Sequence, residues 1–179
     1  ATVELPFFFD PAHAELAEQA RQFVVRGIKP DEDRLMKLAP SDAKGRVERA
    51  RWVAQQLAAG RFLGLCVPAR LGGRASVASP ERTDARAQCL VREALAWATG
   101  PAEGVFAVQC LVAHVLAATA AGPDDAFARG LLAGIVDGSA LGALAVTEAE
   151  AGSDPAGVQC AARRDGEHYV LEGHKTYVS

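Results

Sequence analysis

Between Asp10 and Gly138, apolar residues recur along the chain at the spacing of α-helices. The pair Asp10-Pro11 combines an N-cap acceptor with proline at the first helical position, and the apolar residues that follow predict an amphipathic helix that stops at Pro30. Four further segments show a helical period or a nearly continuous apolar composition, so we expect five helices. The other four begin near Ser41-Asp42, Ser79-Pro80-Glu81, Pro101 and Pro123-Asp124-Asp125, and they end near Gly60, Gly100, Gly122 and Asp137-Gly138.

Each amphipathic helix has a set of apolar positions that we expect to face the core. The sets are Leu16, Ala20, Phe23 and Val24; Val47, Ala50, Ala54, Leu57 and Ala58; Ala87, Leu90, Val91, Ala94 and Leu95; and Phe127, Leu131, Leu132, Ile135 and Val136. The helix that begins at Pro101 is apolar on nearly all sides, and we expect it to be buried all round. His114 in this helix is expected to be a core histidine without a catalytic role.

After Gly138 the period changes from helical to strand-like. Asp165-Gly166 is a hairpin signal between two extended runs. The expected strands and turns are Leu141–Val146, the alternating positions Val158, Cys160 and Ala162, His168–Leu171 and Lys175–Val178. The predicted fold class is therefore mainly α: an N-terminal helical bundle domain (1–138) followed by the first strands of a truncated β-barrel or β-sandwich domain (139–179). A few strands without a second sheet are marginally stable in water, so we expect further chain or a partner chain to complete this domain.

Composition and charge exclude several classes of protein. Hydrophobic residues make up 50% of the chain and charged residues 23%, which indicates a packed core rather than disorder. The net charge of −3 offers no basic footprint for nucleic acid or for an anionic membrane surface. Because the first ten residues contain no lysine or arginine, we do not expect them to act as a secretory signal. Polar residues interrupt the apolar stretch Val105–Ala121, which we interpret as a core helix without membrane insertion. We expect a cytoplasmic protein.

The cysteines show no metal or redox spacing. Cys66, Cys89, Cys110 and Cys160 form no C-x-x-C pair. Each lies among apolar residues, so we expect buried, reduced thiols and no metal site.

A loop after the helical part is the one place where the residues by themselves suggest ligand binding. Thr147 follows an apolar run, and Ala151-Gly152-Ser153-Asp154 is a loop of small residues. Backbone N–H groups in such a loop can bind anionic oxygens, and glycine lets a ligand approach the backbone. Most loops of this composition are simply turns, so the pattern alone favours a turn.

Four motifs, spaced in order along the chain, resemble one enzyme family. Val146-Thr147-Glu148 with Ala151-Gly152-Ser153-Asp154 resembles the T-E-x-x-A-G-S-D signature of the acyl-CoA dehydrogenases. Tyr169–Ser179 resembles the Y-x-L-x-G-x-K-x-aromatic segment of that family. The turn Gly60–Gly73 and the approach Leu131–Gly142 are similar to the corresponding parts of its helical domain. The resemblance covers nearly the whole chain.

The resemblance implies FAD as cofactor and assigns roles to individual residues. Segment 144–147 would lie along the isoalloxazine ring, and Gly152 and Ser153 would contact the phosphate region, with Ser153 also touching the acyl-CoA. A second segment, 177–179, would place an aromatic ring and a hydroxyl against the flavin. The implied cofactor-binding residues are Leu144, Ala145, Val146, Thr147, Gly152, Ser153, Tyr177, Val178 and Ser179.

No catalytic residue is expected in this chain. The base of the family is a carboxylate in a C-terminal helical domain, and Glu148 does not correspond to it. The chain also departs from the family pattern at Ala149 and Glu150, where proline and glycine are usual. Tyr177 stands where tryptophan is common, and Ser179 where threonine is frequent.

The implied function is α,β-dehydrogenation of an acyl thioester with hydride transfer to FAD. The implied partners are an acyl-CoA-type thioester substrate, an electron-accepting flavoprotein, and either further copies of the chain in a homo-oligomer or a completing partner chain. Two alternatives stay open on the same fold: a flavin monooxygenase, or a dehydrogenase of carrier-protein-linked acyl groups. A third alternative is a non-catalytic helical partner subunit.

Overall fold

The computed structural model describes residues 7–31, 33, 37, 42–74, 82–120 and 125–178. The chain divides into two compact units, Ala1–Gly142 and Ala143–Ser179. In the sequence, the change from a helical to a strand-like period lies a few residues earlier, after position 138. The domain limits of 1–138 and 139–179 stay a prediction. Each unit is described by itself.

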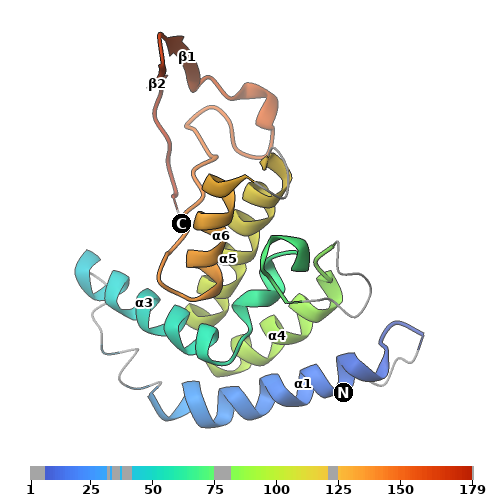
Figure 1. Cartoon of the computed structure of the whole chain (residues 1–179). Coiled ribbons are helices and arrows are strands. Elements are labelled where there is room, and N and C mark those ends of the chain that lie inside the picture. The colour runs from blue at the N-terminus through green and yellow to red at the C-terminus, as the bar shows by residue number, and fades with distance from the viewer. Residues whose placement is uncertain are drawn as a thin grey trace. The chain divides into compact units, whose positions relative to one another are not determined.

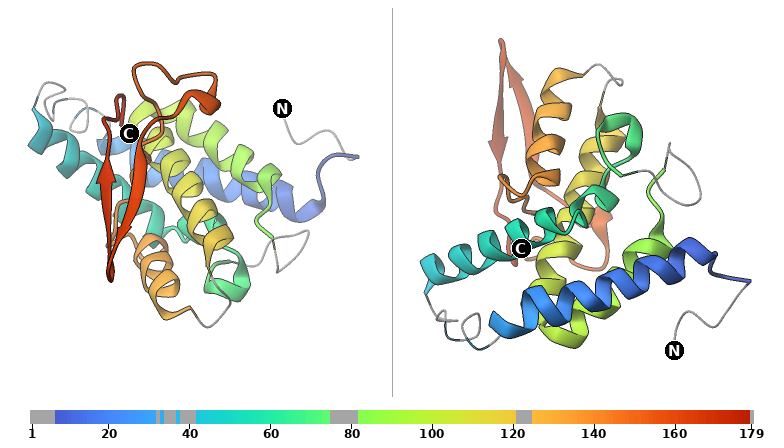
Figure 2. Two further views of the ribbon diagram at one scale, coloured as in Figure 1. Left: turned by 90° about the horizontal axis from the view of Figure 1, so that it is seen from above. Right: turned by 60° about the horizontal axis from the view of Figure 1, so that its bottom comes forward.

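The first unit is built of helices. The described residues contain five α-helices (Figure 1): α1 (Pro11–Phe23), α3 (Ala43–Ala59), α4 (Ala85–Ala98), α5 (Gly100–Thr119) and α6 (Ala126–Val136). A π-helical turn, η1 (Val24–Ile28), continues α1 into a short 3-10 segment, η2 (Lys29–Asp31). Two more 3-10 segments, η3 (Leu63–Cys66) and η4 (Ala69–Leu71), follow α3. Helix α4 packs against α1, and α5 contacts α3, α4, α6 and η3 (Figure 2), so α5 occupies the centre of the unit.

Aspartate side chains fix where three of these helices begin. Asp42, Asp84 and Asp125 each accept a hydrogen bond of 3.0 Å from a backbone N–H group in the first turn of the helix that follows. This bond satisfies a donor that has no partner within the helix. Helix α4 therefore starts at Asp84 rather than at the predicted Ser79-Pro80-Glu81, which lies outside the described residues.

Two predicted helix ends have a different cause in the structure. Gly100 does not close α4; it is the first residue of α5, and Thr99 adopts an extended backbone between the two helices. Helix α3 ends before Gly60 as predicted, but Gly60 keeps a right-handed backbone, and the next residue, Arg61, takes the left-handed conformation with φ of 60°.

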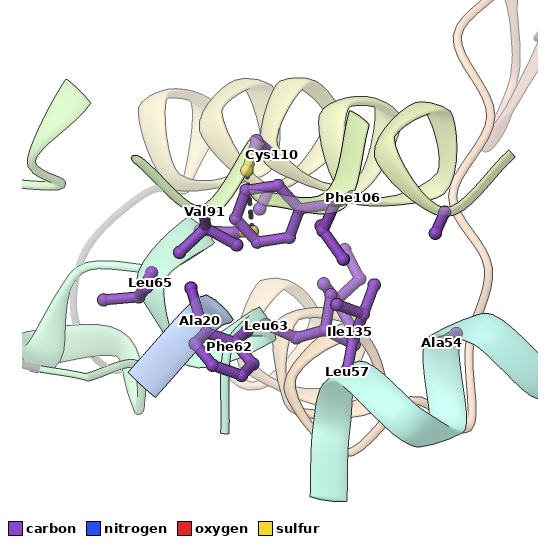
Figure 3. Close-up of a cluster of buried hydrophobic side chains, with 14 of the residues drawn as sticks. Ala20, Ala54, Leu57, Phe62, Leu63, Leu65, Val91, Phe106, Cys110 and Ile135 are labelled. Atoms are coloured by element: carbon purple, nitrogen blue, oxygen red, sulfur yellow. Dashed lines mark hydrogen bonds between the residues drawn. The ribbon is translucent and has the colours of Figure 1, made fainter. Parts of the chain in front are cut away.

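The core of the unit joins side chains from helices that are far apart in sequence. Leu57 of α3, Leu63 of η3, Phe106 of α5 and Ile135 of α6 meet in one cluster (Figure 3), and each is almost fully buried. The core positions predicted for the third helix are all buried. Those predicted for the first helix are buried as well, apart from the half-buried Phe23. Burial of such side chains provides most of the stability of a helical domain, at about 25 cal/mol per Å² of apolar surface.

Several positions predicted to be buried are exposed instead. Val47 is 47% exposed, and Phe127 is 76% exposed. Helix α5 is not buried all round, because Leu111 and Val115 are 54% and 47% exposed. A periodic pattern shows which residues share one face of a helix, but neighbouring helices decide how much of that face is covered.

By length and apolar composition alone, helix α5 could cross a bilayer. Among the described helices, it is the one that meets both criteria. The core helix of a water-soluble protein meets the same criteria. One face of α5, with Phe106, Gln109 and Ala113, is buried against the other helices of the unit.

Close packing fixes the path of the chain as it leaves α6. Gly138 has φ of 73°, and a Cβ atom at this position would lie 2.8 Å from the carbonyl oxygen of Ala54. No other residue fits there without strain. Further on, the backbone N–H of Gly142 donates a 3.1 Å hydrogen bond to Oε1 of Gln109, which is buried in α5. These contacts hold the end of the helical unit against α3 and α5.

The second unit contains one antiparallel hairpin. Strands β1 (Ala161–Asp165) and β2 (His168–Glu172) pair with Arg163 opposite Val170. The two-residue turn is Gly166-Glu167, one position later than predicted, with φ of 61° at Gly166. No other strand occurs among residues 143–178: the predicted strand at Lys175–Val178 is irregular, and residues 141–146 form none either. A strand requires a ladder of backbone partners, and a single backbone hydrogen bond, from Thr176 to Thr147, joins these two parts of the chain among the described residues. The fold class is nonetheless as predicted: mainly α, with a helical domain before the start of a β domain.

Candidate functional site

One backbone hydrogen bond joins the predicted flavin-contacting segment 144–147 to Thr176, the residue directly before the second predicted segment, 177–179. The N–H group of Thr176 donates to the carbonyl oxygen of Thr147 at 2.9 Å. The hairpin β1–β2 turns the chain back between these two residues. Segments 144–147 and 175–178 therefore lie side by side, although neither belongs to a regular sheet.

Glu148 and Lys175 hold this arrangement in place. The Glu148 carboxylate accepts hydrogen bonds from the backbone N–H groups of Gln159 at 2.8 Å and Cys160 at 2.9 Å, and from Nζ of Lys175 at 2.7 Å. Nζ of Lys175 also donates to the carbonyl oxygen of Val146 at 2.9 Å. The hydrogen bond from Lys175, followed by that from Gln159, lowers the pKa of Glu148 to about 2. A carboxylate with so low a pKa is a poor proton acceptor near neutral pH.

Lys175 was not among the residues predicted for the site. Two features of the sequence could have identified it. Lys175 is the lysine of the Y-x-L-x-G-x-K motif, and its charge is opposite to that of Glu148 in the T-E-x-x-A-G-S-D motif. Nothing in the sequence indicated that the two residues meet, because 27 positions separate them.

A tight turn follows Glu148. The N–H of Glu148 donates to the carbonyl of Ala151 at 3.0 Å, and the N–H of Ala151 donates back at 3.2 Å. Ala149 and Glu150 form the corners of this turn, and neither has a positive φ. The glycine that is usual in the family is therefore not required by the backbone at position 150, and the Glu150 side chain is exposed.

The loop after this turn leaves room for a ligand. Gly152 and Ser153 are exposed, and apart from Gly152 and its two chain neighbours no described atom lies within 4 Å of the place where a Cβ of Gly152 would stand. Asp154 turns its carboxylate back to the N–H of Ala156 at 3.0 Å, which starts the 3-10 segment η5 (Pro155–Gly157). The negatively charged carboxylates of Glu150 and Asp154 are the features of this loop that are least favourable for binding a phosphate group.

Most of the predicted cofactor-binding side chains are open to solvent. Val146 is 48% exposed, Val178 55% and Tyr177 90%. Tyr177 also has φ of 52°, a left-handed backbone that is uncommon and costly for an aromatic residue. Ala145 is exposed, and Leu144 and Thr147 are half-buried. Ser179 lies outside the described residues.

The residues of this unit fit the flavin that the resemblance implies. The hydroxyl of Thr176 is a buried oxygen without a hydrogen-bond partner among the described residues, which is unusual in a folded protein. It lies next to the backbone contact with Thr147. Exposed apolar side chains, an exposed aromatic ring and two threonines are a suitable surface for a planar ring system with polar edges.

Comparisons with known proteins agree with the motifs. Residues 10–137 match the family model described as acyl-CoA dehydrogenase, N-terminal domain. The chain is 27% identical over 172 residues to a 3-(aryl)acrylate reductase of Clostridium sporogenes, a match that covers 96% of this chain and 41% of the reductase. It is 43% identical over 58 residues to the acyl-CoA dehydrogenase FadE12 of Mycobacterium tuberculosis, which covers 32% of this chain and 15% of that protein. The chain thus spans less than half the length of these relatives.

Proposed function

The chain belongs to the acyl-CoA dehydrogenase family, and from this premise we propose that it is part of an FAD-dependent enzyme that oxidises the Cα–Cβ bond of an acyl thioester. In this proposal, the chain contributes the N-terminal helical wall and part of the FAD-binding cleft. The proposed substrate is an acyl-CoA-type thioester, and the proposed electron acceptor is a separate flavoprotein. We further propose that the enzyme is a cytoplasmic homo-oligomer.

The observation that carries the proposal is the hydrogen bond between Thr176 and Thr147. It joins Thr147 to the residue directly before segment 177–179, and segments 144–147 and 177–179 resemble the flavin-contacting segments of the family. The Thr176 hydroxyl is buried without a hydrogen-bond partner among the described residues, and the next residue, Tyr177, exposes its ring.

In this proposal, the residues of the chain bind and orient and do not carry out the chemistry. FAD, when bound, supplies the acceptor for the hydride that leaves Cβ. The Thr147 hydroxyl donates a hydrogen bond to a polar edge of the flavin, and Tyr177 packs its ring against the flavin and excludes water. Gly152 and Ser153 direct their backbone N–H groups toward the phosphates, and the Ser153 hydroxyl also contacts the acyl thioester.

The proton of Cα is expected to leave to a carboxylate outside residues 1–179. Glu148 is unsuited to accept it, because its carboxylate already accepts three hydrogen bonds and its pKa is about 2. In this proposal Glu148 is a positioning residue that holds segment 146–148 against Lys175.

A second candidate function is the reverse reaction on an aryl-substituted substrate. The relative that covers 96% of the chain is named a 3-(aryl)acrylate reductase. The same cleft would then hold an α,β-unsaturated substrate, to which a hydride from reduced FAD and a proton are added. The two functions share the residues above and differ in direction and in the substrate.

Replacing Thr147 tests the proposed cleft. In the full-length protein that contains this chain, Thr147→Ala should weaken FAD binding about tenfold, the value of about one lost hydrogen bond, and should shift the flavin absorbance spectrum. Thr119→Ala is the matched control, because among the described residues the Thr119 hydroxyl bonds to carbonyls of its own helix. An unchanged spectrum with unchanged FAD affinity in Thr147→Ala would contradict the placement of the cleft.

Anaerobic mixing distinguishes the two candidate functions. If the protein is a dehydrogenase, a saturated acyl-CoA should bleach the absorbance of its oxidised flavin. If it is a reductase, a 3-arylacrylate compound should instead restore the absorbance of the chemically reduced flavin. Failure of both substrate classes, in a protein that holds FAD, would exclude both reactions.

A further inference from the structure

Two cysteines that are distant in sequence meet in the core of the helical unit. Cys66 ends η3, Cys110 lies in the middle of α5, and their Sγ atoms are 2.8 Å apart (Figure 3). Both thiols are free. Their separation exceeds the length of a disulfide bond, about 2.04 Å, by less than one ångström. All four cysteines were predicted to be buried thiols, but Cys89 is exposed, and Cys160 is half-buried and belongs to the other unit.

We propose that Cys66 and Cys110 are an oxidisable pair, at which a peroxide converts two core thiols into a disulfide that joins η3 to α5. The proposal concerns the helical unit alone and does not depend on flavin binding.

The pair is buried, but one of the two thiols can be reached. Cys66 has no exposed surface, whereas Cys110 is 9% exposed and lines a cavity of about 230 Å³ between α4 and α5. Gln88, Arg92 and His114 also line this cavity, and His114 is exposed there rather than buried in the core as predicted. A water molecule occupies about 30 Å³, so a small polar oxidant such as hydrogen peroxide has room beside Cys110.

The same geometry sets the order of the two steps. The hydrogen bond with the Cys110 thiol, together with burial, raises the pKa of the Cys66 thiol, so Cys66 stays protonated. Cys110 reacts first, because it is the partly exposed thiol of the pair and lines the cavity that the peroxide can enter. Its sulfur attacks one peroxide oxygen, the O–O bond breaks, and Cys110 becomes a sulfenic acid as the first water leaves with the thiol proton.

The second step closes the bond. The sulfur of Cys66 attacks the sulfur of Cys110, the S–O bond breaks, and the hydroxyl leaves with the Cys66 proton as the second water. In sum, two thiols lose two electrons and two protons, and hydrogen peroxide is reduced to two waters. A thiol reductant reverses the change by thiol–disulfide exchange.

Closing the bond ties together segments 44 residues apart, with α4 between them in sequence. A cross-link of this span restricts the unfolded chain and so stabilises the folded unit. The helical unit then becomes more resistant to unfolding under oxidising conditions without a change in its fold.

Peptide mapping of the full-length protein tests the proposal. The reduced protein is treated with hydrogen peroxide, its remaining thiols are alkylated, and it is digested without reductant. We expect a cross-linked pair of peptides that contain Cys66 and Cys110, and a rise in Tm of about 5 °C that a thiol reductant removes.

Three variants separate the pair from the other cysteines. Cys89→Ala removes an exposed thiol and should leave the cross-link and the rise in Tm unchanged. Cys66→Ala should leave Cys110 as a sulfenic acid that a dimedone-type probe labels, and Cys110→Ala should leave Cys66 reduced. The proposal is overturned if Cys66 and Cys110 of the folded wild-type protein both stay alkylatable after a treatment that oxidises Cys89, or if they are cross-linked only to other cysteines.

Discussion

At the scale of single residues, Glu148 is the most constrained side chain of the second unit. Its carboxylate accepts two backbone N–H groups and the ammonium of Lys175. A glutamate beside a proposed flavin segment invites a catalytic interpretation, but all of its close contacts are structural. The role of Glu148 is to fix the chain direction at Thr147, where the proposed cleft begins.

The low pKa of Glu148 predicts an acid transition confined to this unit. The pKa falls from 4.5 to about 2 on folding, so the carboxylate stabilises the unit fully above the unfolded value and loses this effect as the pH drops through about 2. In the full-length protein, we therefore expect the amide hydrogens of Gln159 and Cys160 to lose protection against exchange between pH values of about 4.5 and 2.

Carboxyl NMR of the full-length protein can follow the titration of Glu148 itself. Lys175→Met should raise the pKa of Glu148, because the largest cause of its shift is removed, and Lys175→Arg should largely preserve it. A Glu148 carboxyl that titrates at its ordinary value in the wild-type protein would show that the contacts with Lys175 and the two amides do not form in solution.

At the scale of elements, a buried polar contact joins the starts of α1 and α4. The His13 side chain is fully buried, and its Nε2 donates to Asp84 at 2.9 Å, while its Nδ1 accepts from the N–H of Asp10 at 3.1 Å. Burial raises the pKa of Asp84, but hydrogen bonds from Arg86 and His13 outweigh that effect and leave it below the ordinary value. Asp84 thus caps α4 and fixes its position against α1 at once.

Removing Asp84 should cost more than removing an ordinary cap. Asp84→Ala deletes the N-cap bond and leaves the buried Nε2–H of His13 without a partner, so we expect a loss of about 2–4 kcal/mol in the free energy of unfolding. Asp42→Ala is the matched control, since Asp42 caps α3 with the same 3.0 Å bond but is exposed. Urea unfolding measures both variants, and equal losses would mean that the contact with His13 adds nothing.

At the scale of the whole chain, the two units differ in how they are stabilised. The first has a continuous apolar core that joins residues of all five described α-helices. In the second, every residue of β1 and all but one of β2 are exposed. An isolated two-stranded hairpin is marginally stable in water, so most of the stability of the chain resides in the first unit.

This difference predicts uneven hydrogen exchange. In the 179-residue chain expressed alone, we expect slow exchange in the buried parts of α4 and α5 and fast exchange throughout 143–178, together with weak retention of FAD. In the full-length protein with bound FAD, segments 144–147 and 175–178 should become protected. Mass-spectrometric exchange measures both states, and stoichiometric FAD bound to the 179-residue chain would contradict the expectation.

Much of this protein was decided by interactions between sequence neighbours, and these could be predicted. Helix starts follow from an aspartate and the amides directly after it, as at Asp42 and Asp125. The hairpin follows from glycine in its turn, and the family follows from motifs made of adjacent residues. Such features depend on the local backbone and can be derived without knowledge of the remaining fold.

Only the tertiary structure decided which surfaces are covered and which distant groups meet. Within α3, Val47 lies on the predicted apolar stripe but is exposed, while Val53, outside that stripe, is buried. The contacts of Glu148 with Lys175 and of Cys66 with Cys110 join residues 27 and 44 positions apart. The physical reason is that burial and pairing depend on how whole elements pack against one another, whereas the period of a sequence records only which residues share a face.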